Sequence, residues 1–154
     1  MKVLAIILLL GAVVAPILAS TRCDDWWTLY GGKCYYFRQT AASWLAARSW
    51  CQQQGGDLAR PYTSGRNTFI THLTVGFSEV WIGLSDRARE DHFHWVITDA
   101  HAEYTPWQGN NPDNRNSAGQ AEDCVETRDG LWNDAACSYA RRYVCEKDAS
   151  ACTV

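Results

Sequence analysis

The sequence has no strong cluster of positive charge. Its 14 Lys and Arg residues are outnumbered by 17 Asp and Glu residues, and no basic run is longer than Arg141-Arg142. A protein that binds nucleic acid carries a concentrated basic surface. We therefore exclude nucleic acid as a partner. The chain also lacks internal repeats, low-complexity tracts, linkers and Asn-x-Ser/Thr sequons, so it is predicted to fold as one compact unit.

Recognisable catalytic motifs are also missing. No Gly-x-Ser-x-Gly elbow or other nucleophile signature is present. His92 and His94 would share one face of a strand, but no third ligand is evident nearby, which favours a solvated pair over a zinc site. The sequence thus favours a protein that is not an enzyme. A hydrolase remains the minority hypothesis, which turnover abolished by a single Ser or His substitution would establish.

Only one long apolar run occurs, and it lies at the N-terminus. Lys2 precedes the run from Val3 to Leu18, and the small residues Ala19 and Ser20 follow it. This layout is typical of a secretory signal peptide, and the run is shorter than the roughly 20 apolar residues of a spanning helix. We expect residues 1–20 to be a signal, no membrane span, and a secreted, extracellular domain over residues 21–154.

The cysteines all follow this predicted signal, in a chain expected to meet an oxidising environment where disulfides persist. The seven are Cys23, Cys34, Cys51, Cys124, Cys137, Cys145 and Cys152. Cys23 and Cys34 flank a Gly-Gly turn, and Cys124 and Cys137 flank a short ligand-rich segment, so pairing within each is the economical choice. Cys51 would then pair with Cys145. Cys152 remains, either free, capped or linking two chains into a homodimer or higher oligomer.

Two segments have the pattern of helices. From Thr40 to Gln54 the chain is rich in good helix formers, with Trp44, Ala47 and Cys51 at helical spacing and Gly55-Gly56 as a stop. The second helix would be capped by Ser64 and ended by Gly76. Its inner face would carry Phe69, Ile70 and Leu73.

Short apolar runs predict strands around these helices. Aromatic runs on both sides of Gly31-Gly32 favour an antiparallel pair. Val80 to Leu84 has the pattern of a strand buried on both faces, and Phe93, Trp95 and Ile97 alternate as in a half-buried strand. Two closing strands are predicted at Cys124 to Thr127 and Arg142 to Cys145. The predicted class is α+β, with two helices on small antiparallel sheets.

The tryptophans and the longest loop complete this prediction. Trp81, Trp95 and Trp132 are expected in the core, and Trp107 either in the core or in the wall of a site. Ala102 to Gln120 is rich in Asn, Gly, Pro and Asp. A structureless segment of this length in a compact domain is usually functional.

Oxygen ligands are concentrated between Asn111 and Asp134. The segment contains Asn111-Pro112-Asp113, Glu122-Asp123 and Asn133-Asp134. Such residues are most often ordinary turn formers, but Ca²⁺ also takes about 6 to 8 oxygen ligands from irregular loops. The segment predicts a calcium site, with Ca²⁺ as the cofactor.

The motifs together resemble those of a known family, the C-type lectin-like domain in its long form, which has an extra N-terminal cysteine pair. The matching motifs are Cys23 to Cys34, Cys51, Trp81-Ile82-Gly83-Leu84, Asn111-Pro112-Asp113, Glu122-Asp123-Cys124-Val125, Trp132-Asn133-Asp134 and Cys137 to Cys145. The resemblance covers Cys23 to Lys147. It implies the same three disulfides and a cis peptide bond at Asn111-Pro112.

The resemblance also implies two sets of calcium ligands. The sugar-binding calcium of the family would be held here by Asn111, Asp113, Glu122, Asn133 and Asp134. An auxiliary calcium would take its ligands from Asp86, Glu90, Asn114, Glu122 and Asp123. Vicinal hydroxyls of a sugar would complete the first coordination shell, so the implied partners are glycans.

The order of acid and amide in Asn111-Pro112-Asp113 bears on which sugar is bound. In the family, amide-then-acid order accompanies galactose-type ligands and acid-then-amide order accompanies mannose-type ligands. The resemblance therefore implies a preference for galactose or N-acetylgalactosamine. Asn111 is one methylene shorter than the usual glutamine, and no aromatic residue lies between Asn114 and Ala121. We expect weak single-site affinity, so that useful binding depends on several sites.

Two biological settings agree with this site. The first is a lectin that recognises glycans on microbial surfaces and agglutinates cells in innate immunity. The alternative is an extracellular matrix or biomineral-associated protein that uses the same acidic loop on calcium-bearing surfaces.

Overall fold

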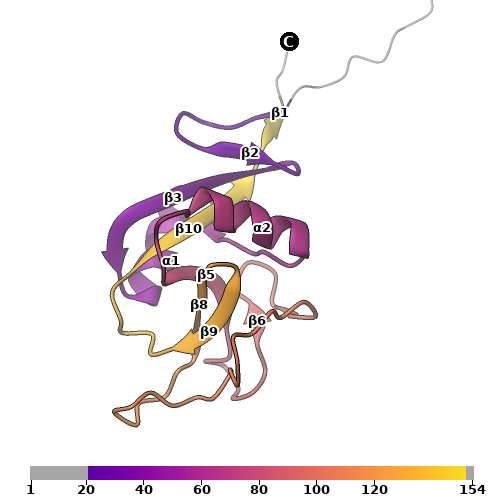
Figure 1. Ribbon diagram of the computed structural model, residues 1–154. Coiled ribbons are helices and arrows are strands. Elements are labelled where there is room, and N and C mark those ends of the chain that lie inside the picture. Colours follow the sequence, from indigo (N-terminus) through magenta and orange to yellow (C-terminus); the bar gives the residue numbers. More distant parts are fainter. Residues whose placement is uncertain (1–20, 152–154) are drawn as a thin grey trace, which may run out of the picture.

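The computed structural model describes residues 21–151 (Figure 1), which form two helices and eleven strands. The helices are α1 (Trp44–Gln53) and α2 (Ser64–Leu73). The strands are β1 (Thr21–Arg22), β2 (Thr28–Tyr30), β3 (Lys33–Ala42), β4 (Asp57–Leu58), β5 (Val80–Ser85), β6 (His94–Trp95), β7 (Ala100–His101), β8 (Cys124–Arg128), β9 (Leu131–Ala135), β10 (Arg141–Asp148) and β11 (Ser150–Ala151). The predicted signal and Cys152 lie outside these residues. No helix within 21–151 has the length and apolar character needed to span a membrane.

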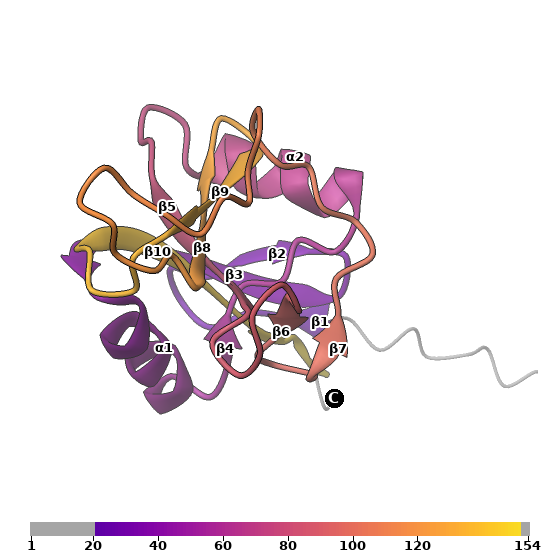
Figure 2. The same cartoon turned by 90° about the horizontal axis from the view of Figure 1, so that it is seen from below.

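Nine strands form one mixed sheet, and β1 pairs with β11 separately. The main path runs β2-β3-β10-β5-β6-β7, while β8 pairs with both β5 and β9. Strand β10 is antiparallel to β3 and parallel to β5, a non-local arrangement that joins the two ends of the chain. Figure 2 shows the strands between the two helices. The α+β class with two helices is confirmed.

The start of each helix differs from the one that the sequence indicates: α1 begins four residues later and α2 begins one residue earlier. Helix α1 begins at Trp44, not Thr40, because β3 continues through Ala42, which pairs with Arg141 of β10. Ser43 caps it by accepting a hydrogen bond from the Ala46 backbone N–H at 3.4 Å.

Helix α2, like α1, has a side-chain hydroxyl as its N-terminal cap. It is capped by Thr63, not Ser64, through the backbone N–H of Arg66 at 3.3 Å. Ile70 is buried on its inner face, while Phe69 and Leu73 are half-buried against the same core cluster.

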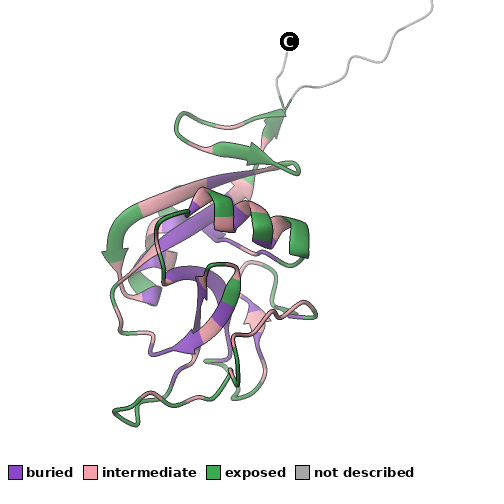
Figure 3. Cartoon of the chain, viewed as in Figure 1, coloured by how far each residue is buried: buried purple, intermediate pink, exposed green. Residues whose placement is uncertain are grey.

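Buried tryptophans fill the core on both sides of β5. Trp81, Trp95 and Trp132 are buried, as predicted. Trp107 is partly buried and packs edge-on against Phe93 and Trp132, with ring centroids 4.9 and 6.0 Å apart. Figure 3 shows burial concentrated along the central strands, and exposed residues along the long loop at the end of the molecule away from β1.

The three predicted disulfides are present. Cys23 is bonded to Cys34, Cys51 to Cys145, and Cys124 to Cys137. The second bond ties α1 to β10 across 94 residues of sequence. The third joins β8 to the turn after β9 and thereby closes the base of the loop region.

Two strand predictions needed correction. The alternation at Phe93, Trp95 and Ile97 extends only over His94–Trp95, because a turn follows in which Thr98 and Asp99 donate their backbone N–H groups to the Trp95 carbonyl. His92 consequently lies outside the strand. The second correction concerns Asn133-Asp134, which the sequence placed among turn-forming residues and which instead lie on β9, paired along its length with β8.

The long loop lies where it was expected. Residues 102–123 contain no helix or strand, apart from a single bridge between Trp107 and Trp132. In Figure 1 the loop lies at the end of the sheet opposite β1. The Asn111-Pro112 peptide bond within it is cis, as the resemblance implied.

Candidate functional site

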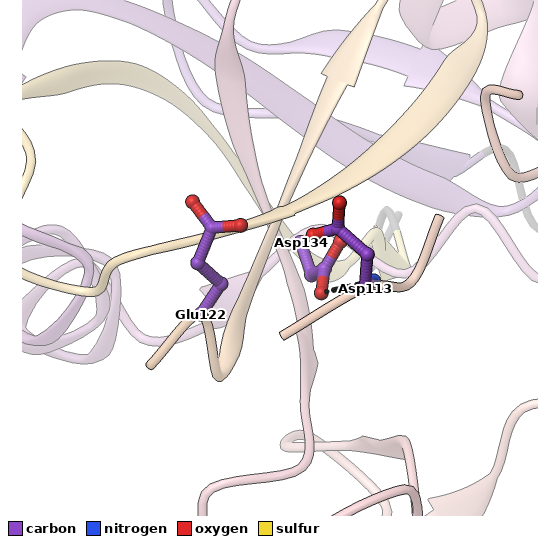
Figure 4. A group of neighbouring side chains, drawn as sticks. All are labelled: Asp113, Glu122 and Asp134. Carbon is purple, nitrogen blue, oxygen red and sulfur yellow. Dashed lines mark hydrogen bonds between the residues drawn. The ribbon is translucent and has the colours of Figure 1, made fainter. Parts of the chain in front are cut away.

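Three carboxylates from distant points of the chain meet beside β9. Asp113 follows the cis Asn111-Pro112 bond, Glu122 precedes β8, and Asp134 lies on β9. One oxygen from each lies within 4.8 Å of the others (Figure 4). No other group of three such side chains converges this closely within residues 21–151.

Asp134 anchors the loop to the sheet. Its side chain is fully buried, and Oδ2 accepts hydrogen bonds from the backbone N–H groups of Asp113 at 2.9 Å and Asn114 at 2.7 Å. The other oxygen, Oδ1, is buried and has no hydrogen-bond partner. A buried carboxylate oxygen without a partner is costly, and a cation placed against it would remove that cost.

The electrostatics of the cluster also favour a cation. Burial, together with the nearby carboxylates of Asp134 and Asp113, raises the pKa of Glu122 to about 7. Burial likewise raises the pKa of Asp134, against the opposing effect of its backbone hydrogen bonds. A divalent ion among these oxygens would offset their mutual repulsion, and hard oxygen donors on flexible loops suit Ca²⁺.

The two amides of the predicted sugar site are brought into the same place. Asn111 donates from Nδ2 to Oδ1 of Asn133, and Asn133 precedes Asp134 on β9. All five residues of the predicted sugar site are thus neighbours, two through their side-chain amides and three through their carboxylates. They can present the Asn111 amide donor beside carboxylate acceptors, which is the pattern needed to read adjacent hydroxyls.

The residues of the predicted auxiliary site are less tightly grouped. Asp86 donates its backbone N–H to the Asp123 carbonyl at 3.2 Å, and Asn114 Oδ1 accepts from the Glu122 backbone N–H at 2.9 Å. Burial, together with the charges of Glu90 and Asp123, raises the pKa of Asp86 to about 6. Its Oδ1 is buried and has no hydrogen-bond partner. This set shares one feature with the first, an unpaired buried oxygen, but not the close convergence of three carboxylates.

One residue beside the site was not found from the sequence. Glu126 on β8 is 1% exposed and accepts a hydrogen bond from Asn133 Nδ2 at 3.2 Å. It stands opposite Asn133 in the β8–β9 pairing. An acid in a short apolar strand was the available signal, but its partner stayed hidden because β9 was not predicted as a strand.

The predicted solvated histidines show no shared metal site. His92 Nδ1 lies 2.9 Å from the Glu90 carbonyl, and His94 Nδ1 lies 3.0 Å from the Asp99 carbonyl. The strand position opposite His94 is occupied by His101. Each histidine therefore has its own local partner.

The geometry defines a class: a disulfide-braced α+β domain that presents an oxygen-rich, calcium-type site on a long loop. The family described as "Lectin C-type domain" matches residues 40–147. The chain belongs to this family, whose domains bind carbohydrate and generally bind Ca²⁺.

Individual relatives agree with this assignment. The chain is 35% identical to the hepatic lectin of Gallus gallus over 123 residues, which cover 79% of this chain and 58% of that protein. It is 32% identical to the galactose-specific lectin nattectin of Thalassophryne nattereri, over 84% of this chain and 83% of that one. The solved carbohydrate-recognition domain of the mouse scavenger receptor C-type lectin superposes with a TM-score of 0.79 at 30% identity, covering 84% of this chain and 100% of that domain.

Proposed function

We propose that the protein is a secreted, calcium-dependent lectin that binds galactose-type glycans through Asn111, Asp113, Glu122, Asn133 and Asp134. The observation that carries this proposal is the convergence of three carboxylates within 4.8 Å around a buried, unpaired Asp134 oxygen. The chain itself offers no lysine or arginine in an ion pair with these three acids among the described residues. The charge needed to balance them would come from the metal.

These residues would have separate tasks in binding. A bound Ca²⁺ would supply a positive centre to which two adjacent sugar hydroxyls can coordinate. The carboxylates would hold the ion and accept hydrogen bonds from the hydroxyls, the Asn111 amide would donate to the same hydroxyls, and Asn133 would offer its amide oxygen to the ion. Asp134 would also keep the loop against β9 through its two backbone hydrogen bonds.

The galactose preference rests on the amide-then-acid order of Asn111 and Asp113. The relative nattectin is named as a galactose-specific lectin, which supports this preference. Since no aromatic side chain lies between Asn114 and Ala121, one site would hold a sugar through a small contact area. Several linked sites would then be needed for tight binding to a microbial surface.

Secretion and assembly are part of the same proposal. Three disulfides agree with an oxidising compartment, and residues 1–20 would act as the signal. Cys152 would join two chains. A nonreducing gel of the secreted protein and of Cys152→Ser tests this link, and monomer mass for both would remove it.

The auxiliary set around Asp86 would bind a second calcium.

The function is tested by retention on galactose-coated resin in calcium, followed by elution with a chelator. Retention that persists in the chelator would contradict the proposal. Adsorption to calcium carbonate that free galactose does not reduce would favour the alternative role on mineral or matrix surfaces. Mannose-coated resin serves as the matched control for sugar type.

A further inference from the structure

Glu126 is a buried acid next to a residue of the proposed sugar site. It is 1% exposed and faces Asn133 across the β8–β9 pair. Its Oε1 accepts a hydrogen bond from Asn133 Nδ2 at 3.2 Å. The carboxylate therefore contacts the site from within the protein, where solvent and sugar do not reach it.

The second oxygen of Glu126 is held by Arg141. Arg141 Nε donates to Glu126 Oε2 at 2.7 Å, and Arg141 Nη1 lies 3.6 Å from Glu79 Oε2. The other oxygen, Oε1, accepts from the Asn133 amide and lies 4.0 Å from Arg128 Nη2. The Glu126 carboxylate therefore cannot rotate without losing the hydrogen bond from Arg141.

This arrangement decides which way the Asn133 amide points. A carboxylate only accepts hydrogen bonds, so it must face the NH₂ group of Asn133 and not its oxygen. The same NH₂ group donates to the Asp134 carbonyl at 2.7 Å. The amide oxygen is consequently turned to the other side, where it accepts from Asn111. An amide binds a metal ion through its oxygen, so this orientation keeps the Asn133 amide oxygen on the side of the proposed site.

We propose that Glu126, held in place by Arg141, is a positioning residue that fixes the Asn133 amide with its oxygen directed into the sugar site. The inference rests on the proposed function, because it assigns Glu126 a role in preparing a ligand of the calcium. It extends that function to a charged pair that touches neither metal nor sugar.

A glutamine at position 126 separates this role from simple packing. Its shape matches glutamate, but one of its two terminal groups is a donor. If that donor faces Arg141, two donors meet; if it faces Asn133, the Asn133 amide must turn over and withdraw its oxygen. Either arrangement disturbs the hydrogen bonds that orient the Asn133 amide, and neither leaves a cavity.

Glu146 provides a matched control. It is also 1% exposed, and its Oε2 accepts a hydrogen bond from the Arg60 backbone N–H at 2.7 Å. It lies on β10 opposite Tyr35 of β3 and Asp57 of β4, away from the loop. Loss of its charge should affect folding without reaching Asn133.

The test measures calcium affinity by calorimetry for wild type, Glu126→Gln, Arg141→Lys and Glu146→Gln. It also records the Asn133 side-chain NH₂ resonances of each protein without calcium. We expect Glu126→Gln to weaken calcium binding about tenfold or more, the usual effect of changing a partner of a metal ligand, and to shift the Asn133 resonances. Arg141→Lys keeps a cation beside Glu126, so its calcium affinity should lie between those of Glu126→Gln and wild type. Glu146→Gln should lower the unfolding temperature but leave both readouts unchanged.

The outcomes separate this inference from the proposed function. Calcium affinity of Glu126→Gln equal to that of wild type, or an equal loss in Glu146→Gln, would overturn the positioning role. A wild-type protein that binds no calcium would instead overturn the proposed function. In that case the Asn133 resonances still decide whether Glu126 sets the amide orientation.

Discussion

The buried acids of the sheet and those of the loop region differ in what balances their charge. In the sheet, both oxygens of Asp57 lie 3.1 Å from Arg48 Nε, and Glu146 accepts a backbone N–H from Arg60. These acids are satisfied by the chain itself. A buried carboxylate that is paired in this way is compatible with a stable fold.

Two buried acids at the loop region are satisfied by the chain at only one of their two oxygens. Asp86 and Asp134 each keep one buried oxygen without a hydrogen bond, and the pKa of Glu122 is raised to about 7 by burial and neighbouring acids. The difference teaches that the scaffold is completed by its own residues, whereas the loop region keeps partly unpaired acids, to which the proposed calcium would bind. Changes in the two regions should therefore separate stability from calcium binding.

The largest effect is expected from removing a disulfide of the scaffold. Replacing Cys51 and Cys145 by alanine opens a loop of 94 residues, for which the chain-entropy model gives a loss of about 4 to 5 kcal/mol in the free energy of unfolding. Replacing Cys124 and Cys137 opens a loop of only 13 residues, with an expected loss of about 3 kcal/mol. Urea denaturation measures both.

The losses of calcium affinity in these two variants should follow the opposite order to their losses of stability. The Cys124–Cys137 bond closes the base of the loop region, so its loss should weaken calcium binding more than loss of Cys51–Cys145 does in protein that remains folded. Equal calcium affinities for the two folded variants would contradict the separation between scaffold and loop.

The second effect compares one acid from each region. Asp134→Asn should weaken calcium binding about 100-fold or more, because the ion loses a charged ligand in a buried position. Its metal-free stability should change little, since an amide oxygen can still accept the backbone hydrogen bonds of Asp113 and Asn114. Asp57→Asn should do the reverse, lowering the unfolding temperature through loss of the Arg48 pair while calorimetry shows the same calcium affinity.

The third effect concerns the choice of sugar. Replacing Asn111 by Glu together with Asp113 by Asn reverses the order of amide and acid while keeping the number of carboxylates. The ratio of mannose to galactose binding should rise about tenfold, which corresponds to roughly one hydrogen bond made or lost. A glycan array in calcium measures the ratio. Asn111→Gln keeps the original order and is the control, so a similar shift in that variant would argue against the role of motif order.

The sequence was sufficient for features that depend on local pattern or on a specific motif. The two helices, the buried strand β5, the long loop and the three disulfides could all be predicted. The structure also brings together as neighbours the five residues of the proposed sugar site, a set that was implied by the resemblance to the C-type lectin-like domain. The helices, β5 and the loop depend on residue patterns within single segments, whereas the disulfides and the site depend on an ordered set of short motifs such as Trp132-Asn133-Asp134.

Features that depend on how one strand pairs with another were missed. Ala42 extends β3 because Arg141 lies opposite it, and no property of residues 40–42 alone shows this. Strand β9 carries Asn and Asp, residues that favour turns, and is held as a strand by its pairing with β8. Glu126 could not be connected with Asn133 until that pairing was known.

The smallest effect is on how stability depends on pH. Acid pH should stabilise the metal-free protein and reduce the stabilisation that calcium provides. The pKa of Glu122 in the metal-free folded protein is raised to about 7 from an ordinary value of 4.5. The folded state therefore holds a proton that the unfolded chain has released between these two values. It follows that metal-free protein should become more stable as the pH falls from 8 towards 5. Burial also raises the pKa values of Glu126 and Glu146, and these residues add to the same slope.

Calcium must displace the proton on Glu122, so its affinity should fall as the pH drops below about 7. Unfolding temperatures measured between pH 5 and 8, with calcium and with a chelator, should thus converge at acid pH and separate at neutral pH. In Glu122→Gln the two curves should lie together throughout. The metal-free slope should persist in part, because Glu126 and Glu146 remain. A calcium-dependent increase in unfolding temperature that is as large at pH 5 as at pH 8 would show that the ion does not compete with this proton, and that the loop acids are not its ligands.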